Sequence, residues 1–291
     1  MVVLVTGSNG QLGQSLQFIK KNYPDIEFVF CDSKQLDITN SKNVKQVFEQ
    51  FKPDFCINTA AYTAVDKAET ESEKASSINV IGAQNLAKAC KISNTVLLHI
   101  STDFVFDGSK TTPYTEDDIP NPTGVYGQTK LDGELAIIAV WEKHFIIRTS
   151  WVYSQFANNF MKTMLRLGSD RDSLSVVNDQ IGTPTNAVDL AEALIKITQS
   201  CHAELDSAST YNHFGVYNFS NEGQCSWFDF AKKIFDLNNI SIALKAISST
   251  DYPTPAKRPA FSVLDKSKIK NVFGFYIKPW KKSLKPFGSS L

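Results

Sequence analysis

The sequence predicts an α/β fold built on a parallel sheet. Its short apolar segments are almost continuously hydrophobic, as expected of strands that are buried on both faces. Segments with helical periodicity alternate with these strands, which is typical of successive βαβ units. The chain has 291 residues, enough to bury a large core in one large or two modest domains. These observations together predict a doubly wound parallel sheet of the Rossmann type, with room for a smaller C-terminal domain.

The first element is a strand that runs directly into a glycine-rich turn and a helix. Residues 1–6 are apolar and rich in β-branched side chains, and residues 14–21 have the pattern of a helix. Between them, Gly7, Gly10 and Gly13 are spaced at intervals of three. Glycines allow a tight turn and let a diphosphate approach the backbone, where the helix N-terminus offers unpaired N–H groups. A simple glycine-rich loop is the weaker interpretation, because strand, turn and helix follow in the order that dinucleotide binding requires.

A second strand is predicted over residues 26–31, and Asp32 follows it. This carboxylate lies about twenty residues beyond the glycines, where an acidic side chain accepts hydrogen bonds from a ribose. A carboxylate at this place repels a 2′-phosphate and favours NADH, although Lys34 could accommodate NADPH. A solvated aspartate in a turn is an equally good interpretation of Asp32 taken alone.

Two further strands are predicted to bring small and polar residues to the same edge of the sheet. The strand at 54–58 ends in the small and polar residues 59–63, and the strand at 95–100 ends in Ser101, Thr102 and Asp103. Ligands of open α/β sheets bind at the carboxyl ends of the strands. The Thr102 hydroxyl is therefore a candidate to hydrogen-bond a carbonyl oxygen of a substrate.

A helix predicted over residues 123–143 carries Tyr126 and Lys130 on one face. A phenol has a reference pKa of about 10, and a neighbouring ammonium group is expected to lower the pKa of Tyr126. The pair would then exchange a proton with a substrate that receives a hydride. A tyrosine and a lysine at this spacing are common by chance. The glycine turn and Thr102 are the features that favour a catalytic role for this pair.

The remaining elements follow from periodicity. A long helical stretch is predicted at 72–91 and a strand at 145–149. Beyond them we expect a helix at 158–167, a strand at 174–177, a helix at 186–198, an exposed loop at 199–214, a strand at 216–220 and a helix at 227–237.

Composition favours a cytoplasmic enzyme. The 30 basic and 30 acidic residues give a net charge of zero, so we expect neither a nucleic acid nor a membrane as a partner. No apolar stretch reaches the length of a membrane span, and the first residues lack the basic region of a secretory signal. The five cysteines and four histidines show no metal-ligand spacing, so no metal-binding residues are predicted. His99, inside an apolar strand, is interpreted as structural.

The motifs around these residues resemble the extended short-chain dehydrogenase/reductase superfamily and, more closely, its dTDP-4-dehydrorhamnose reductase family. The resemblance extends from Met1 to about Pro259 and is weaker at 199–214 and after Phe261. Its motifs are residues 10–13, 58–69, 101–108, 125–130, 148–153, 177–185 and 252–259.

This resemblance implies an activity and a domain division. The activity is reduction of the C4 ketone of dTDP-4-dehydro-L-rhamnose by NADPH or NADH, in the biosynthesis of dTDP-L-rhamnose for cell-surface polysaccharide. Residues 1–150 with parts of about 181–222 are expected to bind the dinucleotide, and about 151–180 with 223–291 to form the substrate domain. A homodimer is implied as well, and Mg²⁺ is implied by the resemblance only.

The resemblance also assigns roles to residues. Tyr126 is the expected proton donor, Lys130 lowers its pKa and binds the nicotinamide ribose, and Thr102 orients the carbonyl. The expected cofactor contacts are Gly7, Gly10, Gln11, Leu12, Gly13, Asp32, Asp37, Ile38, Ala60, Ala61, Tyr62, Thr63, Ile100, Tyr126 and Lys130. The expected substrate contacts are Thr102, Asp103, Trp151, Asn159, Gln180 and Arg258.

Each of these substrate contacts has an ordinary structural interpretation as well. Trp151 could be a core aromatic residue, and Asp103 could cap the following turn. Asn159 and Gln180 could serve in capping and loop hydrogen bonds, and Arg258 could be a solvated loop residue.

Three other functions stay open. An epimerase or dehydratase acting on a sugar nucleotide shares the fold, but Phe104 stands where dehydratases usually carry an acidic residue. A sister reductase could make a different 6-deoxysugar. A non-catalytic regulatory subunit would not need the tuned phenol of Tyr126.

Overall fold

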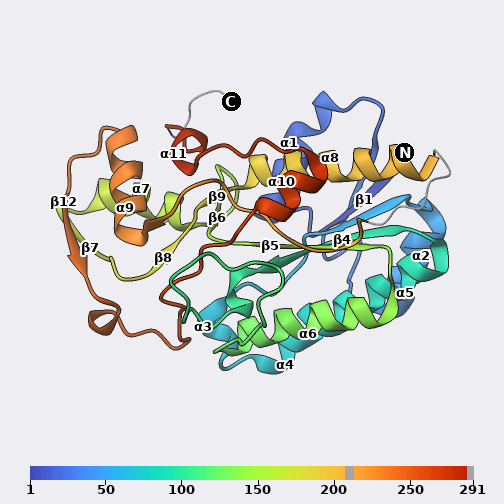
Figure 1. Ribbon diagram of the computed structural model, residues 1–291, viewed down its shortest axis with the longest axis horizontal. Helices are drawn as coiled ribbons and strands as arrows, with labels where there is room; N and C mark the ends of the chain where they lie inside the picture. The colour runs from blue at the N-terminus through green and yellow to red at the C-terminus, as the bar shows by residue number, and fades with distance from the viewer. Residues whose placement is uncertain (207–212, 287–291) are drawn as a thin grey trace.

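The central element of the fold is a six-stranded parallel sheet. The computed structural model describes residues 1–206 and 213–286, and its sheet has the order β10-β5-β4-β3-β1-β2 (Figure 1). Every neighbouring pair of strands in it is parallel, as predicted. The strands are β1 (Val2–Thr6), β2 (Glu27–Phe30), β3 (Phe55–Asn58), β4 (Val96–Thr102), β5 (His144–Thr149) and β10 (Gly215–Asn218).

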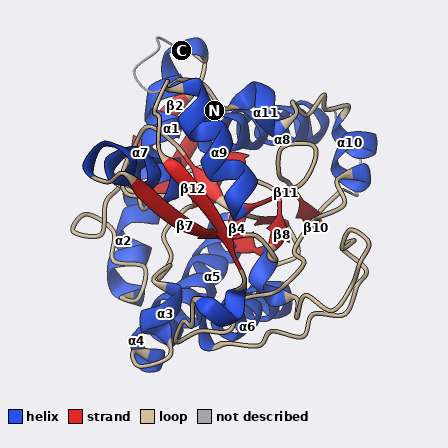
Figure 2. Ribbon diagram, turned by 90° about the vertical axis from the view of Figure 1, so that its left-hand side faces the viewer, coloured by secondary structure: helices blue, strands red, loops and turns tan. Residues whose placement is uncertain are grey.

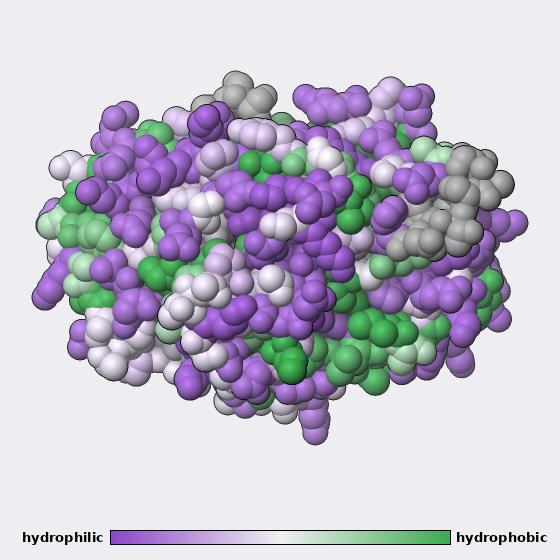
Figure 3. All heavy atoms as spheres, viewed as in Figure 1, coloured by the Kyte–Doolittle hydropathy of each residue, from purple (hydrophilic) through white to green (hydrophobic). Residues whose placement is uncertain are grey.

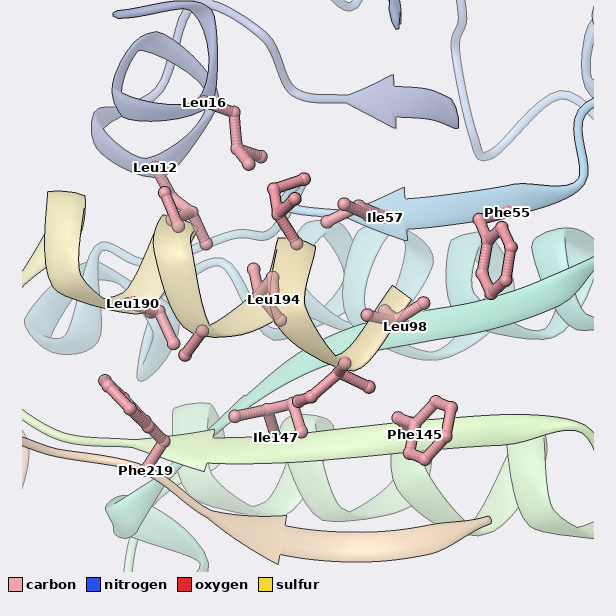
Figure 4. Packing of buried hydrophobic residues seen from close by; sticks show 14 of the residues in the cluster. Leu12, Leu16, Phe55, Ile57, Leu98, Phe145, Ile147, Leu190, Leu194 and Phe219 are labelled. Carbon is pink, nitrogen blue, oxygen red and sulfur yellow. The ribbon is translucent and has the colours of Figure 1, made fainter. Parts of the chain in front are cut away.

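Helices cover both faces of this sheet (Figure 1). One layer contains α1 (Gln11–Ile19), α8 (Ala187–Asp206) and α10 (Ser267–Phe273), and the other contains α2 (Ser41–Phe51), α5 (Ala83–Ser93) and α6 (Val125–Val140). Figure 4 shows the first core, where Leu12 and Leu16 of α1 and Leu190 and Leu194 of α8 meet the sheet. This two-layer cover confirms the doubly wound α/β fold.

A second group of elements lies at one end of the sheet. Strands β7 (Ser173–Val177) and β12 (Ala243–Ile247) form a separate parallel pair, beside α7 (Phe160–Asp170) and α9 (Trp227–Leu237) (Figure 2). These elements enclose an aromatic core of their own. A capping box of Ser226 and Asp229 begins α9.

Short elements complete the described part of the chain. They are η1 (Lys20–Asn22), α3 (Val65–Ala68), α4 (Ser72–Ser76), η2 (Ser77–Gly82), η3 (Asp103–Val105), β6 (Val152–Tyr153), β8 (Ile181–Gly182), β9 (Thr185–Asn186), β11 (Cys225–Ser226), η4 (Ser249–Asp251) and α11 (Trp280–Ser283). No helix in residues 1–206 and 213–286 is both long and apolar enough to cross a membrane.

The structure corrects one predicted loop. Helix α8 continues to Asp206, so residues 199–206 are helical, whereas the sequence predicted an exposed loop at 199–214. Polar Gln199 and Ser200 suggested a loop, but Ile197 and Cys201 are fully buried and hold this part of the helix against the sheet. Residues 207–212 of the predicted loop lie outside the described residues.

Two helical regions of the structure also differ from the prediction. The predicted helix at 72–91 is α4, a π-helical η2 and α5 in succession. Helix α2 was not predicted from the sequence. The side chain of Asn40 caps α2 by accepting from the N–H groups of Lys42 and Asn43, and α2 ends at Lys52 in the left-handed conformation.

Candidate active site

The glycine turn after β1 has the shape of a phosphate-binding loop. A Cβ at Gly13 would lie 2.6 Å from the Gly7 carbonyl oxygen, and one at Gly7 would lie 2.7 Å from the Ala60 nitrogen. Gly7 also has a φ of +62°. Gly10 is the N-cap of α1, and no side chain caps this helix. Because the N-terminal N–H groups of α1 have no side-chain cap, the loop fits the diphosphate of a dinucleotide.

Asp32 stands beside this loop at the end of β2. Its Oδ1 accepts hydrogen bonds from the backbone N–H groups of Lys34 and Gln35, and its Oδ2 accepts from Asn9 Nδ2 at 3.2 Å. The hydrogen bonds from Gln35 and Lys34 hold the pKa of Asp32 below its usual value. The carboxylate is therefore charged and fixed next to the glycine turn, as a ribose-binding residue needs to be.

Other residues predicted for cofactor binding line the same edge of the sheet. The Ala60 N–H donates to Asn58 Oδ1, and Tyr62 is anchored by Asn79 through its backbone N–H. Asp37 accepts a hydrogen bond from Thr39, and Ile38 is buried against Gly82. These two residues therefore support the loop after β2 by ordinary structural contacts.

Tyr126 and Thr102 meet at the carboxyl end of β4, as the sequence predicts. The Thr102 side chain lies close enough to the Tyr126 phenol to lower its pKa. The ring of Phe104 packs edge-on against that of Tyr126, with centroids 5.6 Å apart. Tyr126 is half-buried in the first turn of α6, so its phenol can reach both Thr102 and a ligand above the sheet.

Lys130 lies one turn further along α6 and is buried. Its Nζ donates to the carbonyl oxygen of Ile100 at 2.7 Å and lies 3.2 Å from Nε2 of His99. Nδ1 of His99 in turn contacts Asn58 Nδ2 at 2.9 Å. The sequence analysis interpreted His99 as structural, but in the structure His99 contacts Lys130 directly.

The pKa of Tyr126 differs from the expectation. Burial raises it to about 12, the nearby Thr102 hydroxyl opposes this rise, and Asp103 adds to it. The sequence predicted a lowered pKa because of Lys130, but the Lys130 Nζ is directed to Ile100 and His99. Burial also lowers the pKa of Lys130 to about 8, although Glu134 favours the charged form.

Asp103 lies directly behind this pair and is 2% exposed. Its Oδ1 accepts a hydrogen bond from the Thr102 hydroxyl at 3.0 Å. Burial raises the pKa of Asp103 to about 6, and the hydrogen bond from Thr102 opposes this rise. Asp103 therefore orients Thr102 in this structure, and it is also the first residue of η3.

A buried ion pair supports α6 beneath the site. Arg148 Nη2 of β5 lies 2.7 Å from Glu134 Oε2, and Glu134 also accepts a hydrogen bond from Ser101. The sequence analysis missed Glu134, although it lies four residues after Lys130 on the same face of the helix. This spacing is the signal that could have identified it.

Trp151, which the sequence predicts to contact the sugar, lies just after β5 and packs against the second group of elements. Its ring stacks on Trp227, with centroids 3.5 Å apart and an angle of 9° between the planes. Its backbone has a φ of +46°, which is rare for a bulky residue and marks a strained position. A Cβ at Gly182 would lie 2.5 Å from the Trp151 ring, so that ring also requires a glycine beside it.

The other predicted substrate contacts make structural hydrogen bonds. Asn159 caps α7 by accepting from the Lys162 N–H. Gln180 donates to Ser249 Oγ at 2.9 Å. Arg258 forms an ion pair with Asp66, with Nη2 and Oδ2 2.9 Å apart. Among the described residues, no hydrogen bond joins these three residues to Thr102, Asp103, Tyr126 or Lys130.

The described part of the chain contains no group of three or more histidine, cysteine, aspartate or glutamate residues that could hold a metal ion. All five cysteines are buried thiols. The polar groups of the site are therefore those named above.

Comparison with known proteins gives one consistent family. The family model described as RmlD substrate binding domain matches residues 1–290. The dTDP-4-dehydrorhamnose reductase of Aggregatibacter actinomycetemcomitans is 45% identical over 290 residues, covering 97% of each chain.

Two solved structures extend this similarity to the fold. The structure of a dTDP-4-dehydrorhamnose reductase from Clostridium acetobutylicum has a TM-score of 0.91 and 41% identity, covering 98% of this chain and 97% of the other. The enzyme of Bacillus anthracis, solved in complex with NADP, has a TM-score of 0.88 and 40% identity, covering 97% and 96%. Because the family model matches almost the whole chain and a named reductase is 45% identical to it, the chain belongs to the RmlD substrate binding domain family.

Proposed function

We propose that the chain reduces the C4 ketone of dTDP-4-dehydro-L-rhamnose to dTDP-L-rhamnose, with Tyr126 as the proton donor. The observation that carries this proposal is that the Tyr126 phenol of α6 lies beside Thr102 at the carboxyl end of β4, with its ring against that of Phe104. The 45% identity to a named reductase of this substrate supports the choice of sugar. NADPH or NADH, when bound, supplies the hydride.

The proton of the new hydroxyl group comes from Tyr126 in this proposal. The carbonyl carbon gains the hydride, and its oxygen gains the phenolic proton, which leaves a phenolate at Tyr126. A pKa of about 12 keeps the phenol protonated at neutral pH, which is the form that a general acid needs. The Thr102 hydroxyl donates its proton to Asp103 in this structure, so the proposal requires it to turn from Asp103 to the same oxygen when the substrate binds.

The substrate is proposed to lie between the sheet and the aromatic elements. Trp151 and Asp103 are assigned to the sugar. Asn159, Gln180 and Arg258 remain assigned to the substrate, although each already has a partner: Asn159 caps α7, Gln180 contacts Ser249 and Arg258 pairs with Asp66. Binding by Arg258 would thus require exchange of a carboxylate for a diphosphate, a ligand that suits guanidinium equally well.

The division into domains is part of this proposal. Residues 1–150 with parts of 181–222 would hold the dinucleotide, because they include the glycine turn and the six-stranded sheet. Residues 151–180 and 223–291 would hold the sugar, because their aromatic core carries Trp151 and Trp227.

We also propose that the protein is a homodimer and that it is located in the cytoplasm. The surface that supports a dimer is the apolar face of η2 and α6, where Ile81, Leu135 and Ile138 are exposed. Hydrophobic patches interrupt the mostly hydrophilic surface in Figure 3. Light scattering of the purified chain would measure its mass, and a monomer at micromolar concentration would rule out this assembly.

The activity is tested by following oxidation of NADPH and NADH with dTDP-4-dehydro-L-rhamnose. We expect one cofactor oxidised for each sugar reduced, and none without the sugar. An epimerase or dehydratase would turn the sugar over without net oxidation, and a regulatory subunit would show no turnover.

The role of Tyr126 is tested by Tyr126→Phe. We expect the rate to fall by roughly 10²–10⁴-fold, because the variant lacks the proton that the alkoxide requires. Tyr276→Phe, at a site that is 77% exposed, is the matched control and should keep the full rate. Near-normal turnover of Tyr126→Phe would refute the assignment.

A further inference from the structure

The helix that carries Tyr126 and Lys130 begins without a cap of its own. The N-cap residue of α6 is Gly124, which has no side chain to accept a hydrogen bond from the first turn. The first N–H group paired inside the helix is that of Gln128, which donates to the Gly124 carbonyl oxygen at 3.0 Å. The N–H groups before it have no partner within the helix, as at the start of any α-helix. One of these groups belongs to Tyr126 itself.

Glu69 supplies a partner for this first turn from a distant segment. It follows α3, which lies beside α6 (Figure 1). Its Oε1 accepts a hydrogen bond from the Val125 N–H at 2.9 Å, across 56 positions of the sequence. A side-chain cap usually comes from the N-cap residue of the same helix. Because this cap comes from a neighbouring element, it also fixes where α6 begins relative to α3.

Two glycines make room for the contacts on either side of Tyr126. A Cβ at Gly124 would lie 2.9 Å from Glu69 Oε1, so a side chain there would push the carboxylate out of place. A Cβ at Gly127 would lie 2.2 Å from the Phe104 carbonyl oxygen, so a side chain there would hold α6 away from η3. The position of Tyr126 is therefore set by Glu69 on one side and by the backbone of η3 on the other.

The two helices that begin at the carboxyl edge of the sheet differ in this respect. The N-cap residues are Gly10 in α1 and Gly124 in α6, so neither helix has a side chain at its N-cap. The N-terminal end of a helix carries a partial positive charge and attracts anions. Glu69 places a carboxylate at this end of α6. The end of α1 is left to the diphosphate, for which its glycine turn is shaped.

Glu69 belongs to a short acidic segment whose members hold different elements. Asp66 pairs with Arg258, with Oδ2 and Nη2 2.9 Å apart. Glu71 accepts a hydrogen bond from the Tyr62 hydroxyl at 3.1 Å. Of the three acidic residues, Glu69 is the one that is bonded to the helix carrying the phenol. A substitution of Glu69 therefore tests the start of α6 and leaves the other two contacts in place.

We propose that Glu69 is a positioning residue for the reduction, whose carboxylate caps α6 from outside and holds the Tyr126 phenol where it can reach the carbonyl oxygen of the substrate. The inference rests on the proposed function for its reaction, whereas the cap does not depend on the substrate. Proton transfer requires donor and acceptor within hydrogen-bond reach. Tyr126 is the second residue of α6, so fraying of the first turn would displace its phenol. A displacement of about 1 Å can lower a rate by about 100-fold.

Two substitutions of Glu69 separate the hydrogen bond from other roles of this side chain. Glu69→Ala removes the acceptor, and we expect kcat to fall roughly 10-fold while KM for the sugar and for the cofactor stays within about two-fold. Glu69→Gln keeps an amide oxygen that can accept from Val125 and should restore most of the rate. Glu73→Ala, at an exposed residue of α4, is the matched control and should keep the full rate. Equal losses of kcat in the alanine and glutamine variants would overturn the proposal.

The same bond can also be removed from its donor side. Val125 is the first residue of α6, a position where proline is well tolerated because the helix does not use that N–H group. Gly124 already has the extended backbone that a residue before proline adopts, with φ −146° and ψ 166°. Val125→Pro should therefore keep the helix and lower kcat as Glu69→Ala does. The two substitutions together should cost no more than either alone, and additive losses would contradict a shared bond.

Hydrogen exchange measures the cap without any substrate. The first amides of a helix lack a partner in it and ordinarily exchange fast, so protection of the Val125 amide reports its bond to Glu69. By NMR we expect this amide to exchange roughly 10-fold faster in Glu69→Ala and at nearly the original rate in Glu69→Gln. Unchanged exchange in Glu69→Ala would overturn the proposal.

The exchange measurement also separates this inference from the proposed function. A protected Val125 amide together with a failed cofactor-oxidation assay would refute the substrate and leave the cap in place. An intact assay with an unprotected Val125 amide would refute the cap and leave the substrate in place. If Glu69→Ala does not fold, exchange at Val125 in the unsubstituted chain and the rate of Val125→Pro decide.

Discussion

The two sides of the candidate site are built by different means. On the nucleotide side, glycines let backbone approach backbone, as where a Cβ at Gly13 would lie 2.6 Å from the Gly7 carbonyl oxygen. On the other side, side chains from distant segments stack, as Trp151 does on Trp227. Backbone packing leaves no alternative to glycine, whereas a stack of rings can exchange one large side chain for another. We therefore expect substitutions on the first side to have the larger and more specific effects.

The largest expected effect is that of Gly13→Ala. The new methyl group would meet the backbone at Gly7 and Ser8, both 2.6 Å away, and backbone cannot be displaced cheaply. We expect a loss of about 4 kcal/mol in the free energy of unfolding, measured by chemical denaturation. Gly10→Ala is the matched control, since its Cβ would meet only the Gly7 carbonyl oxygen at 3.3 Å. Equal losses in the two variants would contradict the difference between these glycines.

The second prediction tests the raised pKa that burial gives to Asp103, which lies between the two sides of the site. Its pKa of about 6 lies above the reference value of about 3.9, so between these values the folded state binds more protons than the unfolded state. Stability from this residue is therefore full below about pH 4 and is lost as pH rises to about 6. Relative to Asp103→Asn, the unsubstituted protein should lose about 2–3 kcal/mol over this window. Denaturation at several pH values measures the difference, with exposed Asp25→Asn as control; a constant difference would exclude the raised pKa.

A smaller effect is expected from Trp227→Leu on the aromatic side. The variant removes the ring that stacks on Trp151 and contacts Phe160 at a centroid distance of 4.6 Å. Since leucine still fills part of the space, we expect a loss of about 2 kcal/mol in the free energy of unfolding. The Michaelis constant for the sugar should rise while the affinity for NADPH is kept. A change in cofactor affinity of the same size would mean that the two sides are not separate.

The smallest effect is expected at Asp32. The charged carboxylate repels the 2′-phosphate that distinguishes NADPH from NADH. Asp32→Asn removes this charge and keeps the shape, so the ratio of NADPH to NADH affinity should rise a few-fold, as measured by fluorescence titration. Asp25→Asn should leave the ratio unchanged. A lowered ratio would show that Asp32 does not face the adenosine ribose.

These differences explain what could be predicted from the sequence. The order of strands and helices and the glycine turn follow from local patterns, and the structure confirms them. The proximity of Thr102, Tyr126 and Lys130 follows from strand ends that meet at one edge of a parallel sheet. The sequence could not predict that Lys130 contacts His99 and Ile100, because this depends on how α6 rotates against β4.

The aromatic side was harder to predict for a physical reason. Trp227 lies far from Trp151 in the chain, and their stacking depends on the left-handed backbone of Trp151 and on the space at Gly182. Neither feature leaves a local pattern. The end of α8 was missed similarly, since polar residues at 199–200 mask the buried Cys201 that continues the helix.

The ion pair of Asp66 and Arg258 joins residues 192 positions apart. A ribosome makes a protein from its N-terminus, so β1 to β5 are synthesised well before Arg258. The emerging chain can therefore form its glycine turn and the Tyr126–Lys130 face while Asp66 still lacks this partner. The order of synthesis thus makes the sugar side of the site the last part that can be completed as the chain folds.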